Sequence, residues 1–158
     1  MLIGKKRKLG RKINEIQPGE KLEFTETIED KDLLLYLGLS NDNNPLFIQH
    51  DYASLTPYKK PIVPQVMVIG MITSAVSKYL PGPGSSVLKT DLSFPNPVYH
   101  YEKLSFYLEV QEVKKDKHTI GISVSVLNPD GKTVAEGRLE VCPPYPPKPI
   151  TTRTMENF

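Results

Sequence analysis

The chain has 158 residues, of which 39% are hydrophobic, and this length and composition suit one soluble domain with a single core. The only cysteine, Cys142, excludes an internal disulfide, and the longest apolar run, from Val66 to Ile72 around Gly70, is far shorter than the roughly 20 residues that cross a bilayer. With no secretory leader evident, we expect a cytoplasmic protein without a membrane span.

Residues 1–12 form a basic arm. The arm has no acidic residue and six basic ones, namely Lys5, Lys6, Arg7, Lys8, Arg11 and Lys12. Such a block of like charge could contact the phosphates of CoA, nucleic acid or an acidic carrier protein. Because terminal segments without apolar periodicity are usually loose, we expect a largely solvated arm.

A short strand and a helix are predicted next. Leu22 and Phe24 alternate with polar residues, which indicates a strand that ends near Ile28. Residues 30–39 carry leucines at helical spacing, and acidic residues at their start suit the positive end of a helix dipole. The turn-forming residues 41–44 then end the helix near Leu39, so we expect Asp42 to lie in a loop.

The second half of the chain predicts one long helix followed by strands. Residues 65–80 are apolar on nearly every side, which is typical of a buried helix. Alternating apolar residues predict strands over 86–94, 104–113, 118–127 and 132–141, joined by polar turns. The pattern predicts an α+β domain over 13–142, in which an antiparallel sheet wraps around the helix.

Residues 143–158 form a proline-rich tail. Five prolines fall between positions 143 and 149, and they lack backbone donors and favour extended geometry. We expect the tail to pack along the body more readily than to serve as a ligand for a proline-binding module.

Two blocks of sequence carry a resemblance to a known family. Residues 40–49 read SNDNNPLFIQ and resemble the S-G-D-x-N-P-x-H signature of the MaoC-like hydratases and dehydratases, which act on acyl thioesters such as enoyl-CoA. Residues 61–65 read PIVPQ, where the family usually has P-I-V-H-G at the start of its central helix. The likeness covers roughly residues 13–142, and it implies the hot-dog fold.

The resemblance names Asp42 as the catalytic residue and shows what is missing beside it. In the family, an Asp and a His share one water, deprotonate it near C3 of a 2-enoyl thioester and deliver a proton at C2. Phe47 stands where the signature has histidine, so Asp42 would act alone. Because loss of general acid or base help costs about 10²- to 10⁴-fold, we expect reduced or lost activity.

The start of the central helix is the second part of the implied site. In the family, a backbone amide at that position stabilises the negative charge that develops on the thioester oxygen. Gln65 still supplies this amide, but its side chain adds bulk where glycine allows close approach. Pro64 fits a helix entrance.

Other candidates have structural alternatives. Asp42 and Asn44 suit turns through side-chain to backbone bonds, and Pro45 suits the start of a short helix. Phe47 would fill the former catalytic corner, and Thr73 could offer a hydroxyl to the substrate or bond its own helix. His50 could replace the missing histidine if residues 45–50 are helical, although a surface role is the alternative. His100 and His118 suit structural or solvated positions.

Cofactor, metal and nucleotide sites are not predicted. The sequence has no Cys/His cluster for zinc, and its glycines at 82 and 84 follow a helix instead of a strand, so they form no phosphate loop. DNA binding is a third, weaker alternative that depends on the basic arm alone.

Two hypotheses therefore remain. The chain is either a hydratase or dehydratase for trans-2-enoyl-CoA or 3-hydroxyacyl thioesters, with an impaired active site based on Asp42, or a non-catalytic subunit that binds an acyl thioester. Its substrate would be an acyl-CoA or an acyl carrier protein thioester. By resemblance we expect a homodimer, or a heterodimer with another hot-dog subunit, with the acyl site at the interface.

Overall fold

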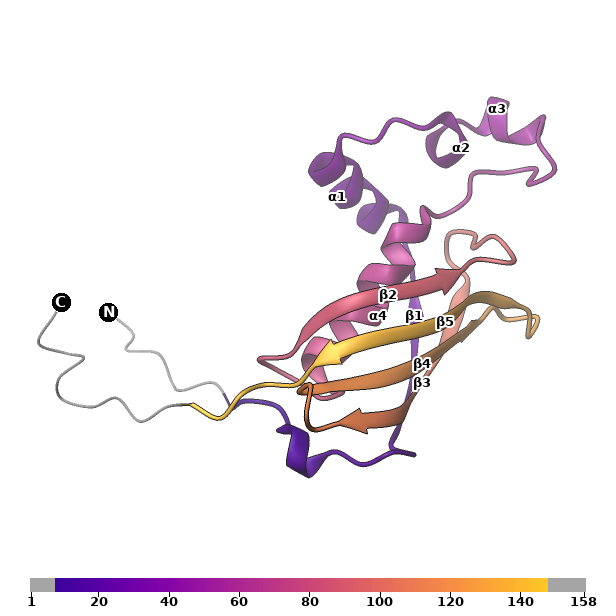
Figure 1. Ribbon diagram of the computed structural model, residues 1–158. Coiled ribbons are helices and arrows are strands. Elements are labelled where there is room, and N and C mark those ends of the chain that lie inside the picture. Colours follow the sequence, from indigo (N-terminus) through magenta and orange to yellow (C-terminus); the bar gives the residue numbers. More distant parts are fainter. Residues whose placement is uncertain (1–7, 148–158) are drawn as a thin grey trace, which may run out of the picture.

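A computed structural model describes residues 8–147 of the chain (Figure 1). The elements in chain order are η1 (Ile13–Glu15), β1 (Lys21–Thr27), α1 (Asp30–Ser40), α2 (Pro45–Ile48), α3 (His50–Ser54), α4 (Gln65–Lys78), β2 (Ser86–Ser93), β3 (Lys103–Lys114), β4 (Thr119–Leu127) and β5 (Thr133–Cys142). Within these residues, no helix combines the length and hydrophobicity that a membrane crossing requires.

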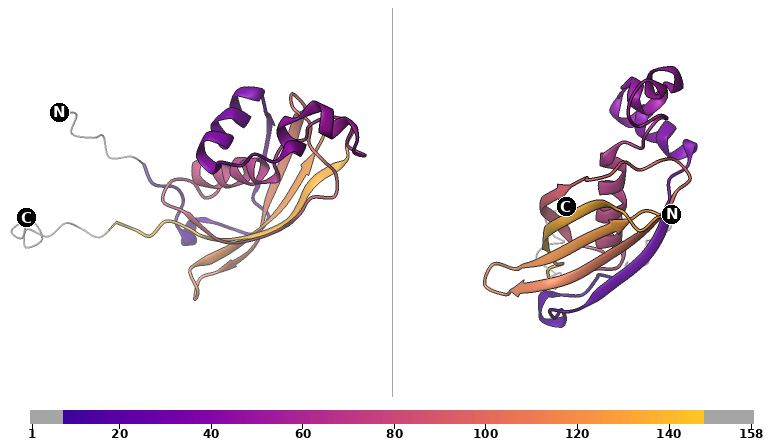
Figure 2. Two further views of the ribbon diagram at one scale, coloured as in Figure 1. Left: turned by 90° about the horizontal axis from the view of Figure 1, so that it is seen from above. Right: turned by 90° about the vertical axis from the view of Figure 1, so that its right-hand side faces the viewer.

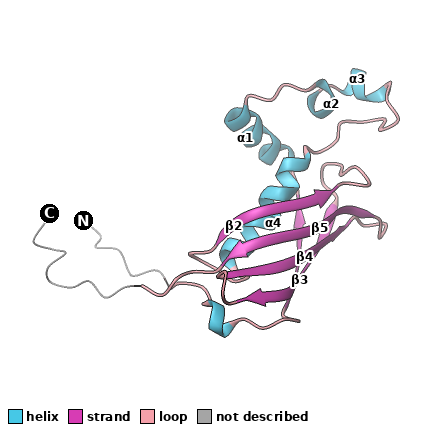
Figure 3. Cartoon of the chain, viewed as in Figure 1, coloured by secondary structure: helices cyan, strands magenta, loops and turns pink. Residues whose placement is uncertain are grey.

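The five strands form one antiparallel sheet that curves around α4. Their order is β1-β3-β4-β5-β2, so the first and second strands along the chain are the two edges. Figure 3 shows α4 lying across the concave side of the sheet. The α+β class and the predicted sheet around a central helix are confirmed.

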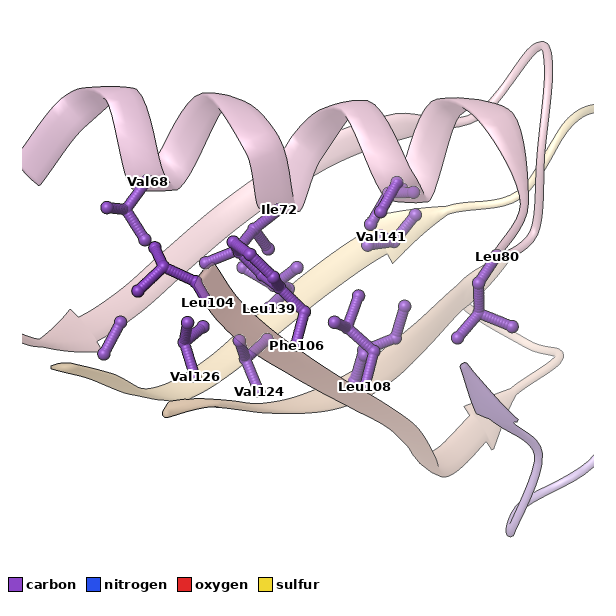
Figure 4. Packing of buried hydrophobic residues seen from close by; sticks show 14 of the residues in the cluster. Val68, Ile72, Leu80, Leu104, Phe106, Leu108, Val124, Val126, Leu139 and Val141 are labelled. Atoms are coloured by element: carbon purple, nitrogen blue, oxygen red, sulfur yellow. The ribbon is translucent and has the colours of Figure 1, made fainter. Parts of the chain in front are cut away.

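The core lies between α4 and the sheet (Figure 4). Leu104, Phe106 and Leu108 alternate along β3 and are almost fully buried, as the period of a strand requires. They meet Val68 and Ile72 of α4 in one hydrophobic cluster. The ring of Phe24 in β1 stacks on Phe106 with 4.6 Å between centroids, which ties this edge strand to the core.

Helix α4 is buried on its sheet side only, which corrects the expectation of burial on nearly every side. Val66 is 47% exposed, Gly70 and Ser77 are exposed, and Thr73 is half-buried. These positions recur at helical spacing and share one face. In the single chain the sheet covers the opposite face of α4. The face that carries Val66, Gly70, Thr73 and Ser77 is left open to solvent.

Helices α1, α2 and α3 lie together beyond the end of the sheet, next to the start of α4 (Figures 1 and 2). Glu29 and Asp32 form a capping box that starts α1. The helix buries only Leu33, while Leu34, Leu35 and Leu39 are exposed. A leucine-rich helix with one buried leucine presents apolar surface to solvent.

The two ends of the described chain meet at the far end of α4. The amides of Gly10 and Arg11 donate to the carbonyls of Pro83 and Pro81 at 2.8 and 2.9 Å, so this part of the basic arm is held against the body. In the tail, Pro143 and Pro144 are buried, and the ring of Tyr145 stacks on that of His118. Residues 1–7, with Lys5, Lys6 and Arg7, and residues 148–158 lie outside the described part.

Candidate functional site

Asp42 lies in the loop after α1, as predicted. Ser40 ends the helix, and Asn41 takes a left-handed conformation with φ 55° and ψ 28° that turns the chain back. The Asp42 amide donates to the hydroxyl of Ser40 at 3.2 Å, and the Asn44 amide donates to Asp42 Oδ1 at 3.1 Å. The turn therefore fixes both the backbone and one carboxylate oxygen of Asp42.

The other carboxylate oxygen of Asp42 is held by Tyr36. The Tyr36 hydroxyl donates to Asp42 Oδ2 at 3.0 Å from the last turn of α1. Burial raises the pKa of Tyr36 above its ordinary value of 10.0, and the hydrogen bond to the Asp42 carboxylate acts in the same direction. Tyr36 is thus a protonated phenol at neutral pH.

Asn44 and Pro45 build the short helix that follows. The Asn44 side chain accepts a hydrogen bond from the Leu46 amide at 3.0 Å, and Pro45 occupies the first helical position of α2. These are the structural roles that the sequence suggests for both residues. They orient the next turn, which carries Phe47.

Phe47 is 9% exposed and lines a cleft of about 450 Å³ between α1, α3 and the turn before β3. The cleft is mostly apolar, with Leu33, Leu34 and Leu37 of α1 on one wall. A phenyl ring can neither give nor accept a proton, so Phe47 itself adds no acid or base to this corner. The geometry favours packing as the role of Phe47.

His100 lies in the same cleft with no hydrogen-bond partner for either ring nitrogen among the described residues. Its side chain is 12% exposed, and its Nδ1 lies 3.7 Å from Asp30 Oδ1, too far for a hydrogen bond. Burial lowers the pKa of His100, although Asp30 acts in the opposite direction and His50 adds to the lowering. His100 is therefore neutral at pH 7.

His50 does not continue the helix of Phe47. Residues 45–50 are not one helix, because Gln49 is extended with φ −113° and ψ 109° between α2 and α3. The premise that His50 shares a helical turn with Phe47 is wrong. A β-like residue after Ile48 redirects the chain, and the exposed His50 begins a separate helix.

Gln65 begins α4, and its loop is tied to the Asp42 segment. The amide of Ile62 donates to the carbonyl of Leu46 at 3.2 Å, and that of Val63 donates to the carbonyl of Val98 at 2.7 Å. No described side chain caps the start of α4, and the Met67 amide donates to the Pro64 carbonyl at 3.0 Å. The amides of Gln65 and Val66 are therefore the ones that can face an anionic oxygen. The Gln65 side chain is exposed at this end.

Thr73 lies two helical turns further along, about 12 Å from Gln65 at 1.5 Å per residue. Its hydroxyl donates to the Gly70 carbonyl at 3.1 Å, the helix-internal bond considered for it. The structure thus places Asp42, Asn44 and Phe47 in one loop and short helix, which the Ile62–Leu46 hydrogen bond joins to the segment before Gln65, and leaves Thr73 further along α4.

Tyr36 is the functional candidate that sequence reasoning missed. Its signal in the sequence is that it is the one tyrosine among the five leucines of residues 30–40, about one and a half helical turns before the turn residues. Within residues 8–147, no three His, Cys, Asp or Glu side chains converge as a metal site requires.

Comparisons with known proteins agree with this geometry. The family model for the MaoC like domain matches residues 14–129. The (R)-specific enoyl-CoA hydratase of Rhodospirillum rubrum is 29% identical over 130 residues, covering 82% of this chain and 90% of that protein. The unliganded R-hydratase PhaJ1 from Pseudomonas aeruginosa superposes with a TM-score of 0.78 and 32% identity, covering 90% of this chain and 97% of that one.

A second solved structure shows the fold alone. The ChsH1-ChsH2 complex from Mycobacterium tuberculosis matches with a TM-score of 0.72 at 20% identity, covering 80% of this chain and 98% of the matched chain. With the sheet, the central helix and both sequence blocks in place, the chain has the hot-dog fold and belongs to the family of MaoC-like domains.

Proposed function

We propose that this protein is an acyl-thioester hydratase that adds water reversibly to trans-2-enoyl-CoA, or dehydrates the matching 3-hydroxyacyl thioester, with an active site centred on Asp42. The observation that carries the proposal is the Asp42 carboxylate, which accepts a hydrogen bond at each oxygen in a loop whose continuation is bonded, through Leu46 and Ile62, to the segment before α4. The relatives named as enoyl-CoA hydratases support this reaction class.

The residues divide the chemistry between them. Asp42 accepts a proton from the water that attacks C3, and a fixed carboxylate needs no reorientation to do so. The free amide of Gln65 faces the thioester oxygen, where negative charge develops in the transition state. Asn44 holds the loop, and Phe47 packs beside it. Thr73 remains a candidate contact for the acyl chain further along α4.

The test is the rate of water addition to a short trans-2-enoyl-CoA. Asp42→Asn keeps the shape and one of the two acceptor oxygens but removes the base, so activity should fall by at least about 10²-fold. Asp51→Asn is the matched control, since Asp51 is an exposed carboxylate nearby in α3. If wild type and Asp42→Asn are equally slow, the proposal fails for this chain on its own.

We also propose that a second hot-dog subunit, identical or related, covers the open face of α4 and the exposed leucines of α1. Val66 is 47% exposed and Leu35 is 74% exposed, which is a large apolar surface for a monomer. Light scattering should give a dimer mass, and Leu35→Glu should lower it towards the monomer. A heterodimer would instead leave the pure chain monomeric until its partner is added.

Binding without catalysis is the alternative function. Phe47 and the apolar cleft of about 450 Å³ beside it favour this role, because the cleft can hold an acyl chain without any proton transfer. Calorimetric titration with a saturated medium-chain acyl-CoA would detect such binding. Leu37→Trp fills the cleft and should abolish it.

A further inference from the structure

The Asp42 carboxylate receives two donors among the described residues, and they differ in chemistry. The Asn44 amide reaches Oδ1 at 3.1 Å, and the Tyr36 hydroxyl reaches Oδ2 at 3.0 Å. A backbone amide holds its proton throughout the physiological range, whereas a phenol can give its proton away. Tyr36 is therefore the acid that lies directly on Asp42.

The reaction needs such an acid, and Phe47 cannot be it. Addition of water to an enoyl thioester requires a base for the water proton and a proton donor for C2. The Phe47 ring carries no exchangeable proton, and His100 lines the cleft beside Phe47, whose lining does not include Asp42. Without another donor, C2 would have to take its proton from bulk solvent.

We propose that Tyr36 is the catalytic proton donor of this site, where it takes the part of the missing histidine. The inference rests on the hydratase function proposed above. It makes Tyr36, which lies outside both sequence blocks, the acid of the acid/base pair.

The separation of the two groups suits the reaction. C2 and C3 of the substrate are bonded neighbours, so a donor and an acceptor that serve them from one face must themselves be adjacent. Tyr36 Oη and Asp42 Oδ2 are 3.0 Å apart, within the reach of about 2.6 to 3.2 Å for direct proton transfer.

Protons and electrons balance without any further reactant. Asp42 takes a proton from water as the oxygen forms its bond to C3, and the C2–C3 π electrons move to C2 with support from the thioester carbonyl. Tyr36 then gives its phenolic proton to C2 and becomes a phenolate. The proton on Asp42 passes across the hydrogen bond to Tyr36, which restores both groups for the next turnover.

The turn around Ser40 holds Tyr36 and Asp42 in place relative to each other. The hydroxyl of Ser40 donates to the Tyr36 carbonyl at 2.7 Å and accepts the Asp42 amide at 3.2 Å. The left-handed Asn41 between them lets the chain return along α1 to meet Tyr36. Because burial raises the pKa of Tyr36, the phenol keeps its proton throughout the neutral range.

The first experiment compares steady-state kinetics of wild type, Tyr36→Phe and Asp42→Asn with a short trans-2-enoyl-CoA. Tyr36→Phe should lower kcat by about 10²- to 10⁴-fold with little change in KM. Tyr52→Phe removes a tyrosine hydroxyl from α3 of the same region and should leave kcat unchanged. Circular dichroism of each variant checks the fold.

A second variant tests whether the reaction depends on the protonated phenol of Tyr36. Replacing Tyr36 by 3,5-difluorotyrosine keeps the hydroxyl and its hydrogen bond but makes the phenol more acidic. If Tyr36 donates the proton, activity is lost as the phenol ionises, so the alkaline limb of the kcat profile should move to lower pH.

The outcomes distinguish the two proposals. Wild-type kcat in Tyr36→Phe together with loss in Asp42→Asn overturns the role of Tyr36 and leaves the hydratase function standing. A low kcat in Tyr36→Phe with an alkaline limb that fluorination does not move also overturns it, because the proton on the Tyr36 phenol then does not govern the rate. No hydration by the wild type overturns both.

Discussion

The amide of Ile62 donates to the carbonyl oxygen of Leu46 at 3.2 Å and so joins the two segments that carry the sequence blocks of the family. Leu46 follows the Asp42 loop, and Ile62 precedes the start of α4 by three residues. This bond links the segment that follows Asp42 to the segment that precedes Gln65, although 23 positions separate these two residues. The following predictions test parts of this arrangement.

Loss of the Asn44 cap should loosen α2. Asn44→Ala removes the acceptor for the Leu46 amide, and loss of such a cap costs about 1 kcal/mol. Equilibrium unfolding in urea should show this decrease in the free energy of unfolding, and hydrogen exchange at the Leu46 amide should quicken. Asn43→Ala, at the exposed position next to it, should change neither measurement.

His100 should make the protein less stable in acid. Its pKa is lowered in the folded protein, so below the unfolded value of about 6.5 the unfolded chain binds a proton that the folded protein does not. The free energy of unfolding should therefore fall as the pH drops from 6.5 towards the pKa of His100 in the folded protein. Above pH 6.5 this contribution should not change with pH.

Urea unfolding at pH 7.5 and 5.5 measures this slope. His100→Phe should remove much of it, whereas His50→Gln should keep most of it, because His50 is exposed. The other charged or titratable groups that line the cleft are Asp30, His50, Lys60, Tyr99 and Tyr101. An equal slope in wild type and His100→Phe would contradict the prediction.

Removal of the Gln65 side chain should speed hydration. Gln65→Gly restores close approach to the first amides of α4, so kcat/KM for a short enoyl-CoA should rise. Gln65→Ala should show a smaller rise, since it keeps only Cβ. If neither variant exceeds wild type, the Gln65 side chain does not obstruct the thioester.

Two glycines should respond in opposite ways to alanine. A Cβ on Gly10 would meet the Pro81 carbonyl oxygen and the Gly82 backbone, so Gly10→Ala should cost about 1 to 3 kcal/mol by forcing the arm away. Gly38 in α1 has open space, and Gly38→Ala should gain up to about 1 kcal/mol from helix propensity. Thermal unfolding of both variants gives the comparison.

Most of the fold was predictable because its signals are local. The alternation of apolar residues gave four downstream strands within a residue or two of β2 to β5, and the turn residues after Leu39 placed Asp42 in a loop. The one-sided burial of α4 was not predictable in this way. The sequence shows that Val66 is apolar, but it does not show whether the sheet of its own chain or another surface covers it.

The site was predictable only in part for a related reason. Asp42 and Asn44 belong to a contiguous motif, and their preference for turns predicts their side-chain to backbone hydrogen bonds. Tyr36 and His100 act through contacts that depend on how the chain folds back, the first through the left-handed Asn41 and the second through α1 packing over the turn before β3. The break at Gln49, which separates His50 from α2, follows from no strong local signal.

The crowded meeting of the two chain ends has a consequence for how this protein can change. There, Gly10, Gly82 and Gly84 lie so close to neighbouring backbone or to Pro144 that added side chains must push something aside. Substitutions at that end therefore lower the stability of the fold. At the opposite end, position 47 carries a phenyl ring where the family signature has histidine, in a short helix whose Phe47 is not part of the hydrophobic core cluster. Chemistry can therefore be lost, exchanged or rebuilt there while the fold stays as it is.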